Sequence, residues 1–229
     1  MKHLKIFVAF LISLNLIAVN YLWAGEAATL VNMIGGKITV IKANKETIVL
    51  KLKDKVEEGD TVITSKDTFA MFKFTDNAET ILRPETEFKI IEHKFVSDDP
   101  SKDKTTSQLL NGGLRRLTGL CGKRGNPDAD KLVTATATVG IRGTIYDVIN
   151  CAGGNGCEKL ENGTYFRVKD GEISIKNDAG EVSISKGQFA QVTSPSSKPV
   201  ILPKDPGFPN MTPPKSMKLN TTDGSQCAA

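Results

Sequence analysis

The sequence is poor in the residues on which many enzymes and nucleic-acid-binding proteins depend. Only two histidines occur among the 229 residues, His3 and His93, so a histidine-based metal site or a Ser-His-Asp triad is not expected. Aromatic residues make up 6% of the chain, which leaves few rings for stacking on sugars. The 30 basic and 26 acidic residues nearly balance, which excludes a strong polyanion binder. We therefore predict no catalytic residues, no metal, no cofactor and no nucleic-acid partner.

Long apolar runs are also scarce, with one exception at the start of the chain. Lys2 and Lys5 precede an apolar run over Ile6–Trp23, and small residues follow from Ala24 onward. This pattern predicts a secretory signal peptide over residues 1–24. A retained membrane anchor is the alternative, since a spanning helix needs about 20 residues. No later run is long enough to span a bilayer, so we expect a periplasmic or secreted protein with no membrane span after cleavage.

The four cysteines agree with export to an oxidising compartment. Cys151 and Cys157 are separated by a flexible Ala-Gly-Gly-Asn-Gly stretch, which predicts a disulfide between them. Cys121 and Cys227 are then left as a second pair. A zinc site is the rival interpretation, but the five-residue spacing and the lack of a nearby histidine disfavour it.

No stretch has the periodicity of an amphipathic helix. Residues 29–193 instead hold short β-type runs separated by turn signals about every ten residues, and apolar residues alternate within the runs. The pattern predicts an all-β fold, a sandwich or barrel-like stack of short antiparallel strands. With Asp170-Gly171 as one of the turns, residues 164–193 are predicted to form a four-stranded meander of hairpins. The polar segment 96–107 is predicted to be an exposed loop.

The last part of the chain differs in composition. Residues 194–229 hold seven of the ten prolines and a single aromatic residue, Phe208. Such a segment cannot form a core of its own. We expect an extended tail that is either disordered or wrapped across the β domain.

An ordered series of short motifs runs through the predicted β domain. The motifs are Gly59-Asp60-Thr61-Val62-Ile63-Thr64, Thr75-Asp76-Asn77-Ala78, Ile81-Leu82-Arg83-Pro84-Glu85-Thr86, Leu110-Asn111-Gly112-Gly113-Leu114, Thr134–Tyr146 with Ile141-Arg142-Gly143-Thr144 inside it, and Gly187-Gln188. The series resembles the FecR domain over about residues 30–193. The resemblance implies an extracytoplasmic all-β module. In full-length family members this module takes part in trans-envelope signalling, in which a cytoplasmic segment controls a sigma factor.

The sequence departs from that plan at both ends. Only five residues precede the apolar run, so we expect no cytoplasmic sigma-binding segment. The proline-rich tail is too short for the family's receptor-docking subdomain. Sigma-factor regulation is therefore not carried over, and the resemblance implies a stand-alone secreted form of the domain.

Several residues were weighed as sites. Arg142, Gly143 and Thr144 are the candidate partner-binding residues, and the competing interpretation is a strand with a glycine-permitted bulge. His93 is predicted to lie on the polar side of a strand. Asn126, Asp128 and Asp130 alternate like the start of a calcium loop, but the glycine and glutamate of that motif are missing, which favours a solvated loop. Arg115-Arg116 and Lys123-Arg124 form a possible small basic cluster.

These observations favour a non-catalytic interaction or signalling module of the bacterial cell envelope. Its expected partner is another envelope protein, reached through a surface or an exposed strand edge. A protein that binds or modifies envelope polysaccharide is the second hypothesis, and a structural envelope subunit is the third.

Overall fold

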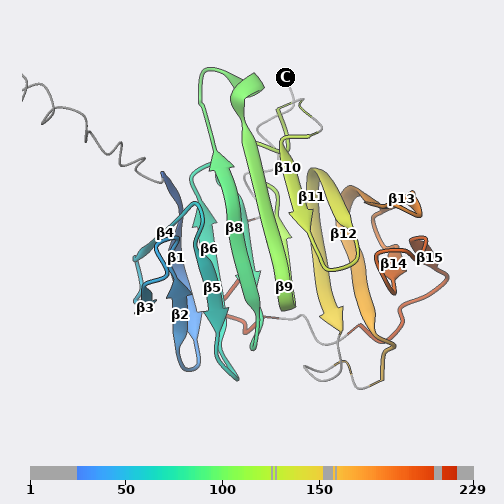
Figure 1. Ribbon diagram of the computed structural model, residues 1–229, viewed down its shortest axis with the longest axis horizontal. Helices are drawn as coiled ribbons and strands as arrows, with labels where there is room; N and C mark the ends of the chain where they lie inside the picture. Colours follow the sequence, from blue (N-terminus) through green and yellow to red (C-terminus); the bar gives the residue numbers. More distant parts are fainter. Residues whose placement is uncertain are drawn as a thin grey trace, which may run out of the picture.

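The structure, a computed structural model, describes residues 25–124, 126, 128–151, 157, 159–208 and 213–220. This part of the chain is almost entirely β, which confirms the predicted fold class (Figure 1). Its elements are β1 (Glu26–Ile34), β2 (Ile38–Ile41), β3 (Thr47–Val49), β4 (Lys55–Glu57), β5 (Thr61–Thr64), β6 (Phe69–Phe74), β7 (Glu79–Leu82), β8 (Glu87–Lys94), the 3-10 helix η1 (Pro100–Lys102), β9 (Lys104–Leu117), β10 (Asp130–Val133), β11 (Thr138–Cys151), β12 (Gly163–Asn177), β13 (Gly180–Ser185), β14 (Phe189–Val192) and β15 (Val200–Leu202).

The predicted signal peptide, residues 1–24, lies outside the described residues. Within them, the structure contains no helix with the length and apolar character needed to cross a bilayer.

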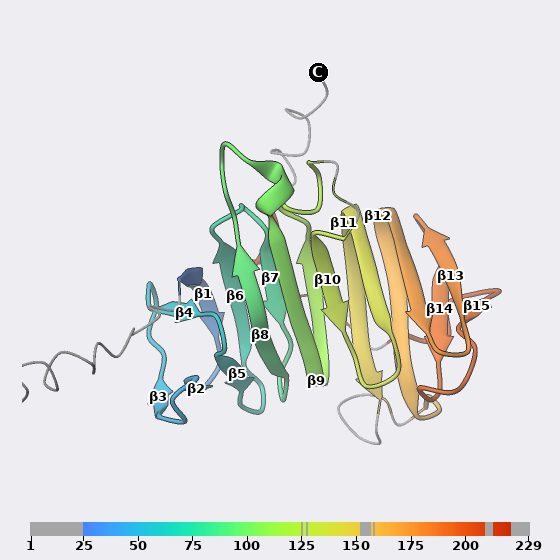
Figure 2. The same ribbon diagram turned by 45° about the horizontal axis from the view of Figure 1, so that its top comes forward.

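The strands form one hydrogen-bonded sheet that is folded over into two layers (Figures 1 and 2). The first layer contains β3, β2, β5, β8, β10 and β13, and the second contains β4, β1, β6, β7, β14 and β15. The three longest strands, β9, β11 and β12, belong to both layers. The first part of β9 pairs with β8 and β10, and its second part pairs with β7 and β11. All neighbouring strands are antiparallel except β9 and β10.

Glycines mark the places where the long strands pass from one layer to the other. Gly143 in β11 and Gly171 in β12 both have positive φ, +59° and +80°. They lie against each other, because a Cβ on Gly171 would come within 2.6 Å of the Gly143 carbonyl oxygen. The register between β11 and β12 shifts at this point, between Arg142 and Ile145. A side chain at Gly171 would collide with the backbone of β11, whereas at Gly143 the positive φ is the main reason for glycine, since an added Cβ would meet nothing closer than 3.9 Å.

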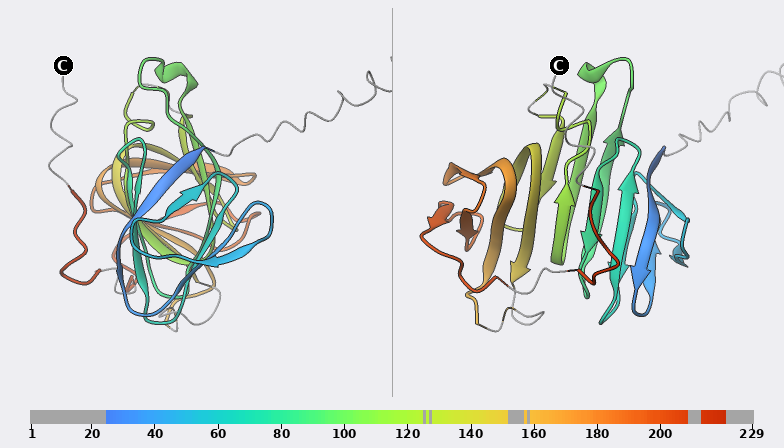
Figure 3. Two further views of the ribbon diagram at one scale, coloured as in Figure 1. Left: turned by 90° about the vertical axis from the view of Figure 1, so that its left-hand side faces the viewer. Right: turned by 180° about the vertical axis from the view of Figure 1, so that it is seen from behind.

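The core fills the space between the two layers, seen along the long axis in the left panel of Figure 3. Alternate residues of each strand point inward, as the period of a β-strand requires. Ile141 and Ile173 enter from the first layer and Val148 and Phe166 from the second, and all four are buried in one cluster. This shared core is what makes the two layers a single folded unit.

Two expectations about local structure were wrong. Residues 164–177 do not form a hairpin at Asp170-Gly171, because β12 continues through Gly171 as one bent strand. The segment 96–107 is not wholly a loop, since β9 begins at Lys104 and lies at the centre of the sheet. In both cases a turn-like or polar sequence is used inside a strand that changes layers.

The described part of the tail first extends the second layer and then packs on its outer face. β15 pairs with β14, and the Phe208 ring lies 6.4 Å from that of Phe189. Further along, Met217 is buried against Met71 and Ile81. This stretch, residues 213–220, is the dark red segment in the right panel of Figure 3. It forms a partial third layer over the sheet.

Candidate functional site

The structure places Arg142, Gly143 and Thr144 at the bend of β11. The Thr144 hydroxyl lies 2.7 Å from the carbonyl oxygen of Glu172 on β12. The Thr118 hydroxyl donates to the Thr144 carbonyl at 2.8 Å and accepts from the Thr144 amide at 3.0 Å. Gly143 and Thr144 therefore have a structural role in bending and tying the strand.

Arg142 is different, because its side chain is exposed. The side chain forms no hydrogen bond or ion pair with another described residue, and it borders a shallow depression of about 150 Å³ beside Glu172 and Ser174. Its role in partner binding stays a prediction.

The predicted disulfide between Cys151 and Cys157 is confirmed, with an S–S distance of 2.04 Å. It follows directly on β11, and both residues are buried with Ile149 and Tyr165. Cys121 is buried and forms no disulfide within the described residues. Its predicted partner, Cys227, lies outside them.

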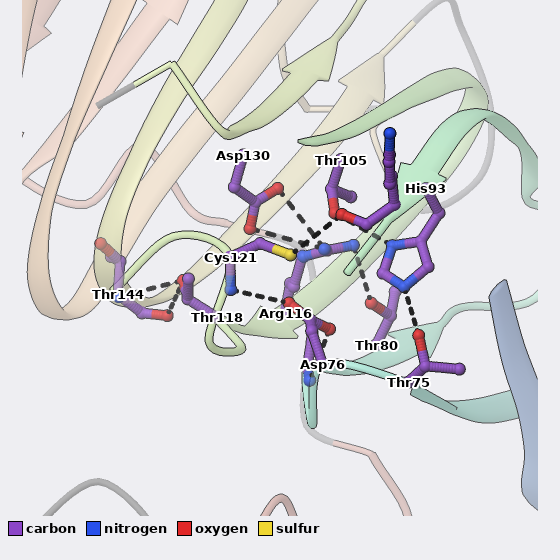
Figure 4. Close-up of polar contacts among 12 residues, drawn as sticks. Thr75, Asp76, Thr80, His93, Thr105, Arg116, Thr118, Cys121, Asp130 and Thr144 are labelled. Carbon is purple, nitrogen blue, oxygen red and sulfur yellow. Dashed lines mark hydrogen bonds and ion pairs between the residues drawn. The ribbon is translucent and has the colours of Figure 1, made fainter. Parts of the chain in front are cut away.

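A cluster of buried polar side chains lies inside the sandwich (Figure 4). Its centre is Arg116 on β9, whose Nη2 lies 3.4 Å from Oδ1 of Asp130 on β10, and each side chain is 1% exposed. The guanidinium carbon lies 4.8 Å from the centroid of the Phe74 ring. Burial raises the pKa of the Asp130 carboxyl to about 6, and the charge of Arg116 opposes this shift. The pair is a buried ion pair, and neither member is a solvated loop residue or part of a surface basic cluster.

His93 belongs to the same cluster, which corrects its predicted surface position. Its side chain is 6% exposed, and its ring nitrogens contact the hydroxyls of Thr75 at 2.7 Å and Thr105 at 3.0 Å. The cause is a bulge in β8, where the register with β9 shifts between Ile90 and Glu92. One extra residue reverses the alternation, so His93 turns inward. Burial lowers the pKa of His93 below its usual 6.5.

Cys121 is close to these groups but is not poised as a nucleophile. Its Sγ contacts the carbonyl oxygen of Lys94 at 3.7 Å, and its amide donates to Oδ2 of Asp76 at 3.2 Å. Burial and then the negative charge of Asp76 raise the pKa of the Cys121 thiol. The raised pKa keeps the thiol in its neutral form, which is a weak nucleophile. No group of acidic, Cys or His side chains among the described residues is arranged to hold a metal.

A second charged cluster lies on the outer face of the second layer. Asp147 on β11 is fully buried and accepts hydrogen bonds from Arg115 on β9, at 2.6 and 3.1 Å. Arg167 on β12 also donates to Asp147, with its Nε at 2.8 Å, and its guanidinium lies over the ring of Phe208. One carboxylate is therefore shared by two arginines, and the cluster keeps a net positive charge.

The predicted basic cluster of Arg115-Arg116 and Lys123-Arg124 does not form. Arg115 and Arg116 point to opposite sides of β9, as neighbours in a strand must. Arg124 pairs with the buried Asp103 at 2.6 Å and stacks over Phe95. These basic residues are close in the sequence, which suggested a single surface patch. In the structure, Arg115, Arg116 and Arg124 instead pair with three different aspartates.

The first layer ends in β3 and β13, and the second layer ends in β4 and β15. β3, β4 and β15 have three residues each, and Pro199 and Pro203 flank β15. β13 has six residues and pairs only with β12 (Figure 2). Since the Lys186 amide donates to Gly171 on β12, the alternation of the ladder turns the amides of Glu181 and Ser183 away from β12. β13 is thus the longest of these end strands with an unpaired edge in the described part of the chain.

No family model and no curated protein matches the chain. Two solved structures of a candidate anti-sigma factor from Parabacteroides distasonis are similar to it, at 11% and 12% identity with TM-scores of 0.48 and 0.47. Each match covers 64% of this chain and 61% of that one, so the chain spans about three fifths of the length of those structures. A cell surface anchoring domain matches 28% of this chain, over 82% of its own length, at 24% identity and a TM-score of 0.26. Likenesses this distant identify neither a family nor an activity.

Sequence reasoning missed the buried ion pairs centred on Asp130 and Asp147. Asp130 and Asp147 lie in segments interpreted as a loop and as an ordinary strand. A signal for Asp147 does exist, because it stands in an otherwise apolar run, Ile145–Ile149, where an unpaired carboxylate would be costly. The partners, Arg115 and Arg167, are 32 and 20 residues away, and no spacing rule connects them.

Proposed function

We propose that the protein is an extracytoplasmic, non-catalytic module of the bacterial cell envelope that binds another envelope protein by strand addition at β13. The observation that carries the proposal is the open edge of this strand. Glu181 and Ser183 present backbone groups that β12 does not use, and such a row is a template for an incoming extended segment.

The residues around β13 support this strand, over the other end strands of the sheet, as the binding edge. A flanking proline removes an amide donor and discourages pairing, and prolines flank β15 but not β13. The side chains of Glu181, Ser183 and Ser185 are polar and solvent-exposed or nearly so. An edge of this kind stays soluble when free and still offers main-chain hydrogen bonds to a specific partner.

The buried acidic residues favour a binding role over hydrolysis of polysaccharide. Asp76, Asp130 and Asp147 each accept hydrogen bonds from protein donors inside the sandwich or under the tail. A glycosidase requires two carboxylates about 5–10 Å apart across an open cleft. The Cys151–Cys157 disulfide supports an oxidising compartment, in agreement with the predicted signal peptide.

The proposal is tested by photo-crosslinking in cells. A benzophenone amino acid is placed at Ser183, and a matched one at Lys51, which is exposed at the opposite end of the sheet. We expect one discrete adduct from position 183 and none from position 51, with the partner identified by mass spectrometry. Ser183→Pro should abolish partner capture by purified protein, and Ser183→Ala should retain it.

The folded state of each variant is checked by circular dichroism before the comparison. Equal adducts from both positions, or full capture by the folded Ser183→Pro protein, would show that the β13 edge is not the binding site.

A further inference from the structure

A groove lies between the outer face of the second layer and the tail segment 213–220. Its volume is about 430 Å³, within the range of about 300–1,000 Å³ typical of small-molecule sites. The sheet contributes Ile81, Arg115, Ile145 and Lys169 to one wall. The tail segment contributes the other wall, so the groove exists only because the chain returns over its own sheet.

The tail wall is held in place by specific contacts. The Asn32 side chain donates to the Ser216 carbonyl at 3.1 Å. The Asn220 amide and side chain donate to the two oxygens of Glu79, at 2.7 and 2.8 Å. Between these anchors Met217 is buried on the sheet. The groove is therefore bounded by fixed elements on both sides.

The charged residues that line the groove are all basic. They are Arg115, Lys169, Lys215 and Lys218. Within the described residues the three lysines form no ion pair, and Arg115 shares Asp147 with Arg167. The remaining lining is apolar, from Ile81, Ile145, Met217, Leu219 and the prolines 213 and 214. A site with unpaired cations beside an apolar wall is complementary to a molecule with an anionic head and an apolar body.

We propose that this groove binds a single-chain anionic amphiphile, with its carboxylate or phosphate held by Lys169 and Lys218 and its chain against Ile145 and Met217. The inference goes beyond the proposed function, since the groove is formed by the second layer and the tail and not by the β13 edge. Desolvation and the positive charge of Arg115 lower the pKa of Lys169, and an anion at this place would relieve that repulsion. The tail segment already occupies one side, which leaves room for a small molecule and not for a protein surface.

The test uses dodecanoate and dodecyl phosphate as probes, below their micellar concentrations, with the full chain. Binding is followed by calorimetry and by the methyl NMR signal of Met217. We expect one site per chain for both probes and a shift of the Met217 signal. Lys169→Met and Lys218→Met should each weaken binding by at least about fivefold. Lys66→Met, at an exposed turn away from the groove, should leave it within about twofold.

Two further ligands distinguish the contribution of the anionic head group to binding from that of the alkyl chain. Neutral dodecyl maltoside lacks the charge, and inorganic phosphate lacks the chain, so both should bind at least about tenfold more weakly than dodecyl phosphate. Preference between dodecanoate and dodecyl phosphate then assigns the head group. Equal affinity for dodecyl maltoside, or unchanged affinity in the Lys169→Met/Lys218→Met double variant, would overturn the proposal. Neither result would bear on partner capture at β13, so the two proposals fail separately.

Discussion

Arg115 and Arg116 are neighbours in β9, yet they serve two different regions of the molecule. Arg116 points into the sandwich and faces Asp130, with both side chains 1% exposed. Arg115 points out of the second layer and binds Asp147, under the returning tail. In the interior region Arg116 pairs with Asp130, and a second buried acid, Asp76, accepts a hydrogen bond from the Cys121 amide. The outer region sets two arginines against one acid and adds the lysines of the groove.

The comparison suggests that the interior charges support the fold, whereas the outer charges are suited to binding a ligand. Inside the sandwich, a buried charge without a partner lowers stability, and there Arg116 pairs with Asp130 while Asp76 is held by backbone amides. On the outer face, solvent moderates the repulsion, and an excess of positive charge is tolerated. We infer that the interior cluster stabilises the fold and that the outer cluster is available for binding.

The largest effect is expected from removing the interior cation. Arg116→Met leaves the Asp130 carboxyl buried without its partner, and we expect a loss of about 3–5 kcal/mol in the free energy of unfolding. Arg115→Met should cost less, because Arg167 still donates to Asp147. Urea denaturation of the two variants measures the difference.

A double variant sharpens this comparison. Arg116→Met with Asp130→Leu replaces the interior pair by apolar groups and should recover much of the loss. An equal cost for Arg115→Met and Arg116→Met would contradict the distinction between the two regions.

The bend of β11 and β12, where Gly143 and Gly171 lie against each other, can be tested directly. Gly171→Ala places a methyl group 2.6 Å from the Gly143 carbonyl oxygen at a φ of +80°, so we expect a loss of about 2–4 kcal/mol in thermal or urea unfolding. Gly187 is the matched control, since its φ is +82° and nothing lies within 4 Å of an added Cβ. Gly187→Ala should cost only about 1 kcal/mol. Equal losses at the two sites would show that close packing at the bend contributes nothing.

The free energy of unfolding should depend on pH because of the buried Arg116–Asp130 pair. The pKa of Asp130 is about 6 in the folded chain and about 3.9 in an unfolded one. As the pH rises from 4 to 6, the unfolded state gives up its proton first, so the free energy of unfolding falls by about 1–3 kcal/mol from this group. His93, with its lowered pKa, acts in the opposite sense and destabilises the fold as the pH falls below 6.5.

Carbon-detected NMR of the Asp130 carboxyl separates the two effects. The carboxyl should titrate near pH 6, and the free energy of unfolding of the wild type should fall relative to that of Asp130→Asn as the pH rises through this window. A midpoint near 4 would mean that the carboxyl is not desolvated.

Much of the fold followed from local sequence patterns. The short β-type runs expected within residues 29–193 are strands, β6 among them, and the glycine-rich stretch between Cys151 and Cys157 indicated their disulfide. These features depend on neighbours in the sequence, where alternation and turn chemistry act.

The features that failed depend on distant partners. Asp170-Gly171 was predicted to be a turn, but it lies inside β12 where the strand changes layers. The polar residues Thr105 and Ser107 suggested a loop, although they face the interior cluster. The groove was not predicted, because its two walls lie far apart in the chain and meet only when the tail folds back. The alternation of apolar and polar residues does not show that one strand belongs to two layers, or that the tail forms one wall of a groove.

Among these variants, Lys169→Met should have the smallest effect on stability, although it should weaken ligand binding strongly. Lys169 is exposed and forms no ion pair within the described residues, and Arg115 lowers its pKa by repulsion. Lys169→Met should therefore leave the free energy of unfolding within about 0.5 kcal/mol of the wild type, or raise it slightly. Differential scanning calorimetry without ligand measures this, beside the affinity for dodecyl phosphate. A loss of stability as large as that of Arg115→Met would place Lys169 among the structural charges, and the contrast between the interior and outer regions would no longer hold.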